Sequence, residues 1–425
     1  MNYSLSKLSS GLNLLTVSMP SLESVTVTVW VKTGSRYEEI KINGISHFLE
    51  HMVFKGSQKR PSAKAISEVV DSIGGEFNAG TAKDWTNFYI KTRVGNLDLA
   101  MDVLSDMVLN PLLKSEEIER EKGTIIQEIA MYEDTPMMHI GDVFEELVFE
   151  GNPLGRDIAG TPKTVKGIKR EDFLEYRKLH YHPDQMMVSI VGGVTEEKGR
   201  TLVEKYFGSL TPFKDTVFKG KEFRSKQSNP QFKLQTKKAE QAHLIMGFMS
   251  EGRNYEGRFA QSLLAVILGG GMSSRMFTEV RERRGLAYSI HTGVERYQEI
   301  GYLSTYAGVD VTKADLAVAV ILEQYYGISN NQFPISNEEF KKAKEFLKGH
   351  LALSLEDTKD VTSFFADQAM FADEVLTPEE IYKKVDKVKI SDIMSEAKKL
   401  FVPERLNLAI IGPFKDKEKF VQLLQ

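Results

Sequence analysis

The five residues His47-Phe48-Leu49-Glu50-His51 combine side chains that could hold a metal ion and activate water. On a helix, positions four apart lie one above the other, so the two imidazoles can point at one ion. Glu50 lies near the same face and could take a proton from a water molecule. A bare histidine pair at this spacing is more often structural. The full pattern is a moderately specific sign of a catalytic zinc site, which needs three protein ligands and one open position.

A third ligand must come from elsewhere in the chain, and the absence of cysteine restricts it to His, Asp or Glu. Residues 115–134 predict a long helix, because Ser115 is a suitable N-cap and isoleucines recur along one face. Glu121 and Glu128 lie two turns apart on this helix. Most glutamates on such a helix are solvated, but these two are candidate oxygen ligands.

Length and composition indicate an ordinary globular protein. The chain has 425 residues, of which 41% are hydrophobic and 27% charged, enough for two or more domains with full cores. A net charge of −4 makes nucleic acid an unsuitable partner. No stretch has the length and apolarity of a membrane span or a signal peptide, so we expect no membrane association and a cytoplasmic location, although export without a leader stays open.

The chain repeats itself. Residues 165–192 align without a gap on residues 385–412, and both segments read as an amphipathic helix, a proline-containing turn and an apolar strand. A second match aligns Gly44 with Gly257, each at the start of a helix. The three ionisable positions of the first helix then fall on Ala260, Leu263 and Leu264. One half therefore has the side chains for chemistry, and the other lacks them.

The repeat predicts the domain organisation and the fold class. We expect an N-terminal zinc-binding catalytic domain over residues 1–213, a linker rich in Lys, Pro and Ser over 214–231, and a homologous C-terminal domain over 232–425. Each half mixes strands of period two with long helices, without regular βαβ crossovers. This pattern favours an α+β fold over a doubly wound sheet.

At this point the sequence resembles a known family, the pitrilysin-like metallopeptidases, whose inverted zinc motif is called inverzincin. It is most similar to the branch of processing peptidases and their bacterial relatives, over nearly the whole chain. Glu119-Arg120-Glu121 and Gln127-Glu128 match the family's second motif. The resemblance implies that His47, His51 and Glu128 bind one Zn²⁺ per chain, that Glu50 is the general base, and that Glu121 orients a ligand. It also implies two similar domains, each an antiparallel sheet with helices on one face.

Three further segments match family features. The segment around Asn78 and Ala79 resembles a substrate-binding edge strand, to which a peptide would add by backbone hydrogen bonds; a plain edge strand is the alternative. Arg281 and Tyr288, seven residues apart, match a pair implied to stabilise the tetrahedral intermediate; on spacing alone Arg281 would be a surface cation. The glycines at 269–271 fit a helix stop or a mobile substrate-contacting loop equally well.

The resemblance also implies an assembly and a substrate class. Family members enclose substrate between two such two-domain halves, so a homodimer forming a closed chamber is implied, with Arg281 and Tyr288 facing the partner's zinc helix. The implied activity is zinc-dependent endoproteolysis of unfolded peptides or presequence-like segments. Two alternatives stay open: a non-catalytic assembly subunit, and a peptide-binding chaperone that retains the site as a relic. The sequence does not identify the substrate or the cleavage preference.

Overall fold

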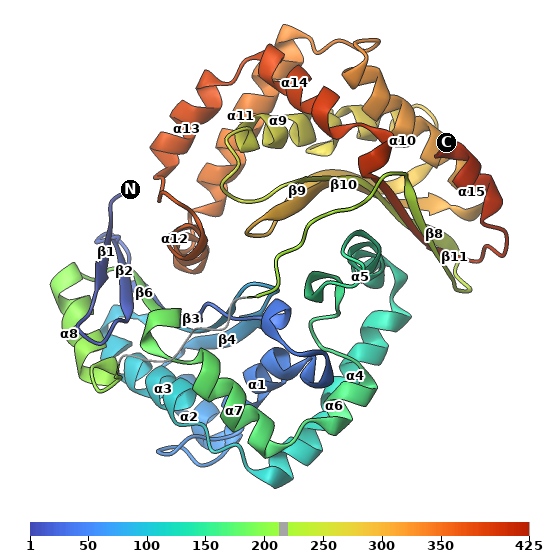
Figure 1. Ribbon diagram of the computed structural model, residues 1–425. Coiled ribbons are helices and arrows are strands. Elements are labelled where there is room, and N and C mark those ends of the chain that lie inside the picture. Colours follow the sequence, from blue (N-terminus) through green and yellow to red (C-terminus); the bar gives the residue numbers. More distant parts are fainter. Residues whose placement is uncertain (212–219, 425) are drawn as a thin grey trace. The chain divides into compact units, whose positions relative to one another are not determined.

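The computed structural model describes residues 1–211 and 220–424, which form two compact units (Figure 1). The first unit comprises Met1–Ala130, Arg156–Lys221 and Leu353–Thr377, and the second comprises Met131–Gly155, Glu222–Ala352 and Pro378–Gln425. The domain boundary predicted after residue 213 and the first part of the predicted linker lie outside the described residues.

The first unit is built on a six-stranded sheet of order β1-β2-β6-β3-β5-β4. Its strands are β1 (Tyr3–Lys7), β2 (Asn13–Ser18), β3 (Ser24–Val31), β4 (Glu76–Thr81), β5 (Thr86–Arg93) and β6 (Met186–Gly192). Strands β2 and β6 run parallel, and every other neighbouring pair is antiparallel. Strand β4 ends the sheet and, within residues 1–211 and 220–424, pairs with a strand on one side only, β5.

The second unit repeats this sheet without the first strand. Its order is β7-β11-β8-β10-β9, with one parallel pair, β7–β11, at the same place. The strands are β7 (Gln231–Thr236), β8 (Gln241–Glu251), β9 (Ala287–Arg296), β10 (Ile300–Asp310) and β11 (Leu406–Gly412). Strands β6 and β11 close the two segments that match in the sequence. The duplication and the α+β class are therefore confirmed, with one parallel pair in each otherwise antiparallel sheet.

Alternation along the strands explains how each sheet buries its main face. In the first unit, alternate valines of β3 join a core with four principal helices: α1 (Ile45–Val53), α3 (Leu97–Leu109), α4 (Ser115–Asp134) and α7 (Arg170–His180). In the second unit, alternate residues of β8 and β11 meet the equivalent helices, which include α9 (Arg258–Gly269), α10 (Ala314–Ser329), α11 (Asn337–Ser354) and α14 (Ile390–Leu400). The period of two places the intervening side chains on the opposite face.

Each sheet also receives one helix on that opposite face, from the other half of the chain (Figure 1). Helix α12 (Thr358–Phe371) packs on the first sheet, where the hydroxyls of Thr26 and Thr358 lie 2.7 Å apart. Helix α5 (Pro136–Val148) packs on the second sheet through apolar residues such as Phe144. The compact units therefore differ from the contiguous ranges 1–213 and 232–425 by this exchange of helices.

The described residues contain five further α-helices: α2 (Ala63–Ser72), α6 (Pro162–Gly167), α8 (Glu196–Phe207), α13 (Pro378–Lys387) and α15 (Glu418–Leu423). Among the described residues, no helix has both the length and the apolarity needed to cross a bilayer.

Candidate metal centre

Helix α1 carries the H-x-x-E-H motif, and a buried carboxylate fixes its first turn. Its N-cap, Gly44, has φ of 99°, and a Cβ there would approach a backbone oxygen at 2.4 Å, so glycine is required. Glu38, 3% exposed, accepts hydrogen bonds from the backbone N–H groups of Gly44 (2.7 Å) and Ser46 (2.8 Å). These bonds satisfy donors that a helix N-terminus leaves unpaired. The other face of the helix enters the core through Phe48, Leu49, Met52 and Val53.

Helix α4 brings the acidic residues to the same place. Ile118, Ile125 and Ile129 are buried, as the periodicity predicts, and they fix the rotation of the helix about its axis. Glu121 and Glu128 consequently project toward α1, where Glu121 is buried and Glu128 is partly exposed.

The structure brings His47, His51 and Glu128 together, with one ligand atom from each lying within 4.8 Å of the others. The Nε2 atom of His47 lies 3.6 Å from one oxygen of Glu128, and Nε2 of His51 lies 3.5 Å from the other. Ligands about 2.0–2.2 Å from a tetrahedral zinc ion are roughly 3.4 Å apart. Two imidazoles and one carboxylate at this spacing fit a catalytic zinc ion in both geometry and donor chemistry.

Glu121 has a different position from Glu128 and a different contact. Its Oε1 lies 2.8 Å from Nδ1 of His51, and its Oε2 lies 2.6 Å from Nζ of Lys55. A proton on Nδ1 leaves Nε2 of His51 free to bind a metal, which is the usual arrangement of an orienting carboxylate. Burial raises the pKa of Glu121, but the hydrogen bonds from His51 and Lys55 outweigh it, so the pKa lies below its ordinary value.

His47 is suited to bind as a neutral ligand. Burial, with a smaller contribution from the neighbouring His51, lowers the pKa of His47 to about 4. The imidazole is therefore neutral near neutral pH, and the tautomer with its proton on Nδ1 can offer Nε2 to a metal. Among the described residues, the buried Nδ1 of His47 has no hydrogen-bond partner.

Glu50 lies beside the three ligands without belonging to them. The hydroxyl of Thr81, at the end of β4, donates a hydrogen bond of 2.5 Å to Oε2 of Glu50. Burial raises the pKa of Glu50 above its ordinary value, although the Thr81 bond opposes the shift. A fixed carboxylate with a raised pKa next to a metal site is suited to accept a proton from water and return it.

A pocket opens next to Glu50 and joins the site to the edge strand. It has a volume of about 300 Å³ and is lined by Glu50, His51, Phe54, Lys55, Phe77, Asn78 and Glu121. Asn78 and Ala79 belong to β4, whose outer side has no strand neighbour within the part of the chain that the structure describes. The side-chain oxygen of Asn78 accepts a hydrogen bond of 2.9 Å from the backbone N–H of Ala79. The free edge can thus receive an extended peptide beside the candidate metal site.

Arg281 and Tyr288 lie together in the second unit. Arg281 belongs to a π-helix, Phe277–Glu282, and its guanidinium carbon lies 5.6 Å from the ring centre of Tyr288. Tyr288 stands at an irregularity between β9 and β10 and is 76% exposed. Bulges of this kind re-aim side chains. By contrast, Arg283 and Arg284 both pair with Glu279, each at 2.5 Å.

The sequence did not single out the contacts of Thr81, Lys55 and Glu38. Lys55 follows His51 by one helical turn, which is a usable signal for a residue near the same face. Thr81 and Glu38 give no comparable signal, because a strand-end threonine and a glutamate next to a second glutamate are common on protein surfaces.

Both halves of the chain match known protein families. The family description "Insulinase (Peptidase family M16)" matches residues 13–162, and "Peptidase M16 inactive domain" matches residues 167–347. An uncharacterised zinc protease of Streptomyces coelicolor is 33% identical, covering 97% of this chain and 90% of its own length. The uncharacterised zinc protease YmxG of Bacillus subtilis is 34% identical, covering 95% and 97%.

Two solved structures share the fold. A protease from Helicobacter pylori superposes with a TM-score of 0.91 at 22% identity, covering 96% of this chain and 99% of that chain. An M16 inactive-domain structure from Pseudomonas fluorescens gives 0.88 at 16% identity, covering 97% and 99%. The family matches over both halves and the two relatives of 33% and 34% identity show that the chain belongs to the insulinase family of peptidases, M16, and that its relatives include proteins named zinc proteases.

Proposed function

We propose that this chain is a zinc-dependent endopeptidase that cleaves unfolded peptides, with one zinc ion per chain. The proposal rests on one observation: the imidazoles of His47 and His51 on α1 and the carboxylate of Glu128 on α4 lie together, with the carboxylate of Glu50 beside them. Family relatives named zinc proteases support the choice of metal and reaction. His47, His51 and Glu128 are the proposed ligands.

The chain's own residues supply the acid–base chemistry. Zinc bound there would polarise the scissile carbonyl and lower the pKa of its water to about 7. Glu50 takes the proton of the attacking water and later donates it to the leaving amine, and Thr81 keeps the carboxylate aimed at the site. Glu121 holds His51 in the tautomer whose Nε2 is free.

Strand β4 selects the form of the substrate. An extended peptide pairs with its free edge at Asn78 and Ala79, so recognition depends mainly on the peptide backbone. Such pairing requires an unfolded segment, because a residue already in a helix or sheet has no free backbone groups to offer. Presequence-like segments and other unfolded peptides meet this requirement.

The oxyanion is stabilised by a second copy of the chain. In this proposal the protein is a homodimer that encloses a chamber, and Arg281 and Tyr288 of one copy face the zinc helix of the other. Their adjacency and the exposure of Tyr288 support the assignment, since donors that act on substrate must reach solvent in the free protein.

A quenched-fluorescence peptide library tests the proposal, with zinc content measured on the same samples. Glu50→Gln should retain zinc and lower turnover by about 10²–10⁴-fold, the usual contribution of a general base. Glu128→Gln should lose zinc. Glu116→Gln, on the exposed first turn of α4, is the matched control and should behave as wild type.

Two results would contradict the proposal. Cleavage by Glu50→Gln at the wild-type rate would show that Glu50 is not the general base. Peptide binding that is unchanged by chelation, with no cleavage by wild-type protein, would instead favour the chaperone or assembly-subunit alternative.

A further inference from the structure

The loop between α1 and α2 is tied to the segment that leads into α4. Its backbone N–H at Gln58 donates to the carbonyl of Asn110 (3.0 Å), and the N–H of Leu112 donates to the carbonyl of Gly56 (3.0 Å). The loop follows the helix with the two histidines, and the segment at 110–112 precedes the helix with Glu128. This loop therefore links the two helices that supply the proposed zinc ligands.

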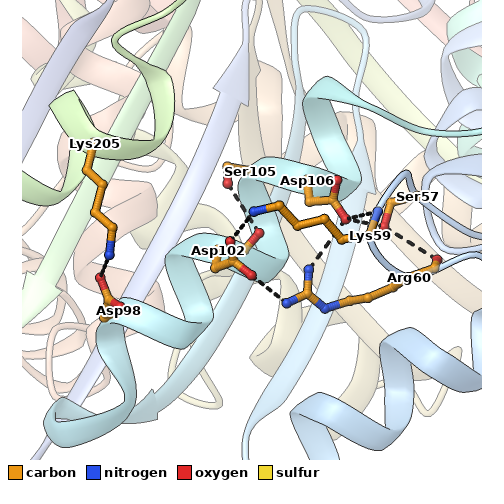
Figure 2. Close-up of polar contacts among 8 residues, drawn as sticks. All are labelled: Ser57, Lys59, Arg60, Asp98, Asp102, Ser105, Asp106 and Lys205. Carbon is orange, nitrogen blue, oxygen red and sulfur yellow. Dashed lines mark hydrogen bonds and ion pairs between the residues drawn. The ribbon is translucent and has the colours of Figure 1, made fainter.

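A buried carboxylate on a third helix, α3, holds the same loop (Figure 2). Asp106 is 2% exposed. Its Oδ2 accepts from the hydroxyl of Ser57 (2.5 Å), the backbone N–H of Lys59 (3.1 Å) and the guanidinium of Arg60 (3.4 Å). Three donors from four consecutive loop residues thus converge on one oxygen.

A second carboxylate, one turn earlier on α3, completes the arrangement. Asp102 accepts from the guanidinium of Arg60 at 2.6 Å and from the ammonium of Lys59 (Figure 2). These cations occupy the space between the two aspartates, so the pair does not form a cation site. Asp98, one turn further back, pairs with exposed Lys205 at 2.7 Å, and among the described residues it has no contact with the loop.

Burying a carboxylate is unfavourable unless hydrogen bonds compensate the charge. The three loop donors stabilise the charge of Asp106, and Asp106 in turn holds the loop in place. Among the described residues, the other oxygen of Asp106 is buried without a hydrogen-bond partner. The compensation therefore comes from the loop, and a loop displaced from Asp106 would leave an uncompensated buried charge.

The held loop begins beside the proposed metal site. Lys55 lies two residues before Ser57 and donates to Glu121 at 2.6 Å, and the other oxygen of Glu121 contacts His51. We propose that Asp106 is a positioning residue for the metal centre: it fixes the loop that places Lys55 against Glu121, and thereby the orientation of His51. This inference rests on the proposed zinc site.

Zinc affinity of the full chain, measured by competition with a chelator, tests the inference without depending on catalysis. Asp106→Asn keeps an acceptor oxygen but removes the charge, and it should weaken zinc binding by about tenfold, at the low end of the range for residues that support metal ligands. The visible spectrum of the cobalt(II)-substituted protein should change as well. Asp98→Asn, the matched control on the same helix, should leave both unchanged.

A double-mutant cycle tests whether Asp106 affects zinc binding through Lys55. If Asp106 acts through Lys55, then Asp106→Asn combined with Lys55→Met should weaken zinc binding less than the two separate effects predict. Additive effects would overturn the route. A lower melting temperature for Asp106→Asn with wild-type zinc affinity and cobalt spectrum would overturn the inference itself, because it would show a purely structural role.

A milder variant covers the case in which Asp106→Asn does not fold. Ser57→Ala removes one donor to the same oxygen and retains the charge pairs, so zinc binding should weaken in the same direction by a smaller factor. Unchanged affinity in a folded Ser57→Ala protein would then count against the inference. Absence of zinc binding in the wild type would instead refute the proposed function, which keeps the two failures distinct.

Discussion

The equivalent helices α1 and α9 show how one fold serves two purposes. Helix α1 follows β3 and helix α9 follows β8, which occupy equivalent places in the two sheets. Each helix packs on the main buried face of its own sheet. Where α1 has His47, Glu50 and His51, α9 has alanine and two leucines, which are 5%, 0% and 0% exposed. The contrast extends in part to α4. When the first turns of α4 and α11 are aligned, Glu121 falls on Ala343, which is 1% exposed, whereas Glu128 falls on the exposed His350.

The difference teaches that the polar cluster is not needed for folding. The second unit fills the three positions of α1 with core side chains and keeps the same strand order. In the first unit these positions carry groups that lose hydration on burial and stay partly exposed, at 12% for His47 and 20% for His51. Such groups are unfavourable in a protein interior unless they are paired, so their presence in one copy alone points to chemistry.

The largest effect is expected when the three ionisable residues of α1 are replaced by their counterparts in α9. His47→Ala, Glu50→Leu and His51→Leu together should abolish zinc binding and reduce peptide cleavage to background. The fold should persist, because α9 shows that this surface accepts apolar residues. Zinc content, peptide turnover and denaturant unfolding of the zinc-free proteins measure the three outcomes. Residual zinc-dependent cleavage, or loss of the fold, would break the comparison between the units.

Much of this comparison could be predicted from the sequence, because it depends on local spacing. The constant offset between residues 165–192 and 385–412 predicted two equivalent units, and the spacing of the two histidines predicted their common face. The spacing of Glu121 and Glu128 left their roles open until the family resemblance was considered. In the structure, Glu121 lies on Nδ1 of His51, whereas Glu128 faces Nε2 of both histidines.

Contacts between segments distant in the sequence could not be predicted. Thr81 reaches Glu50 because β4 ends beside α1, and Asp106 reaches the loop after α1 because α3 packs next to it. Neither residue type has a spacing that sets it apart from other strand-end threonines or helical aspartates. The exchange of α5 and α12 depends on which sheet face each amphipathic helix covers, and the hydrophobic periodicity of the helices does not specify this.

The pH dependence of the free energy of unfolding of the zinc-free protein tests the difference between the units at His47. Its counterpart in the second unit, Ala260, has no titratable group. The folded-state pKa of His47 is lowered to about 4, while the unfolded chain has an ordinary value near 6.5. Between these values the unfolded state binds more protons, so the free energy of unfolding should fall as the pH decreases from about 6.5 to 4. The shift corresponds to about 3 kcal/mol.

Urea unfolding of chelated protein at a series of pH values measures this effect. His180, whose pKa burial also lowers to about 4, contributes a similar dependence, so the comparison must be with His47→Gln. The wild type should lose more stability than His47→Gln over this range. Parallel curves for the two proteins would show that His47 is not held neutral in the folded state.

The smallest expected effect concerns the hydroxyl of Thr81, which contacts the proposed general base Glu50. Leu263 stands in the place of Glu50 in the second unit and requires no donor, whereas Glu50 accepts a bond of 2.5 Å from Thr81. Thr81→Val preserves the shape and the strand preference of the side chain but removes this donor. Because a hydrogen bond to a charged group contributes about 1.5–3 kcal/mol, and part of this is recovered by water at a partly exposed site, turnover should fall about tenfold. Zinc content should not change.

Separation of kcat from KM distinguishes aiming of the base from binding of the peptide, since Thr81 lies on the same strand as Asn78 and Ala79. A loss confined to kcat indicates that the base is misplaced, whereas a higher KM at constant kcat indicates that the strand no longer receives the peptide. Thr81→Ser retains the hydroxyl and should keep most of the activity. An equal loss in the serine and valine variants would assign the effect to the methyl group and to strand geometry, and the link between the edge strand and Glu50 would then have no basis.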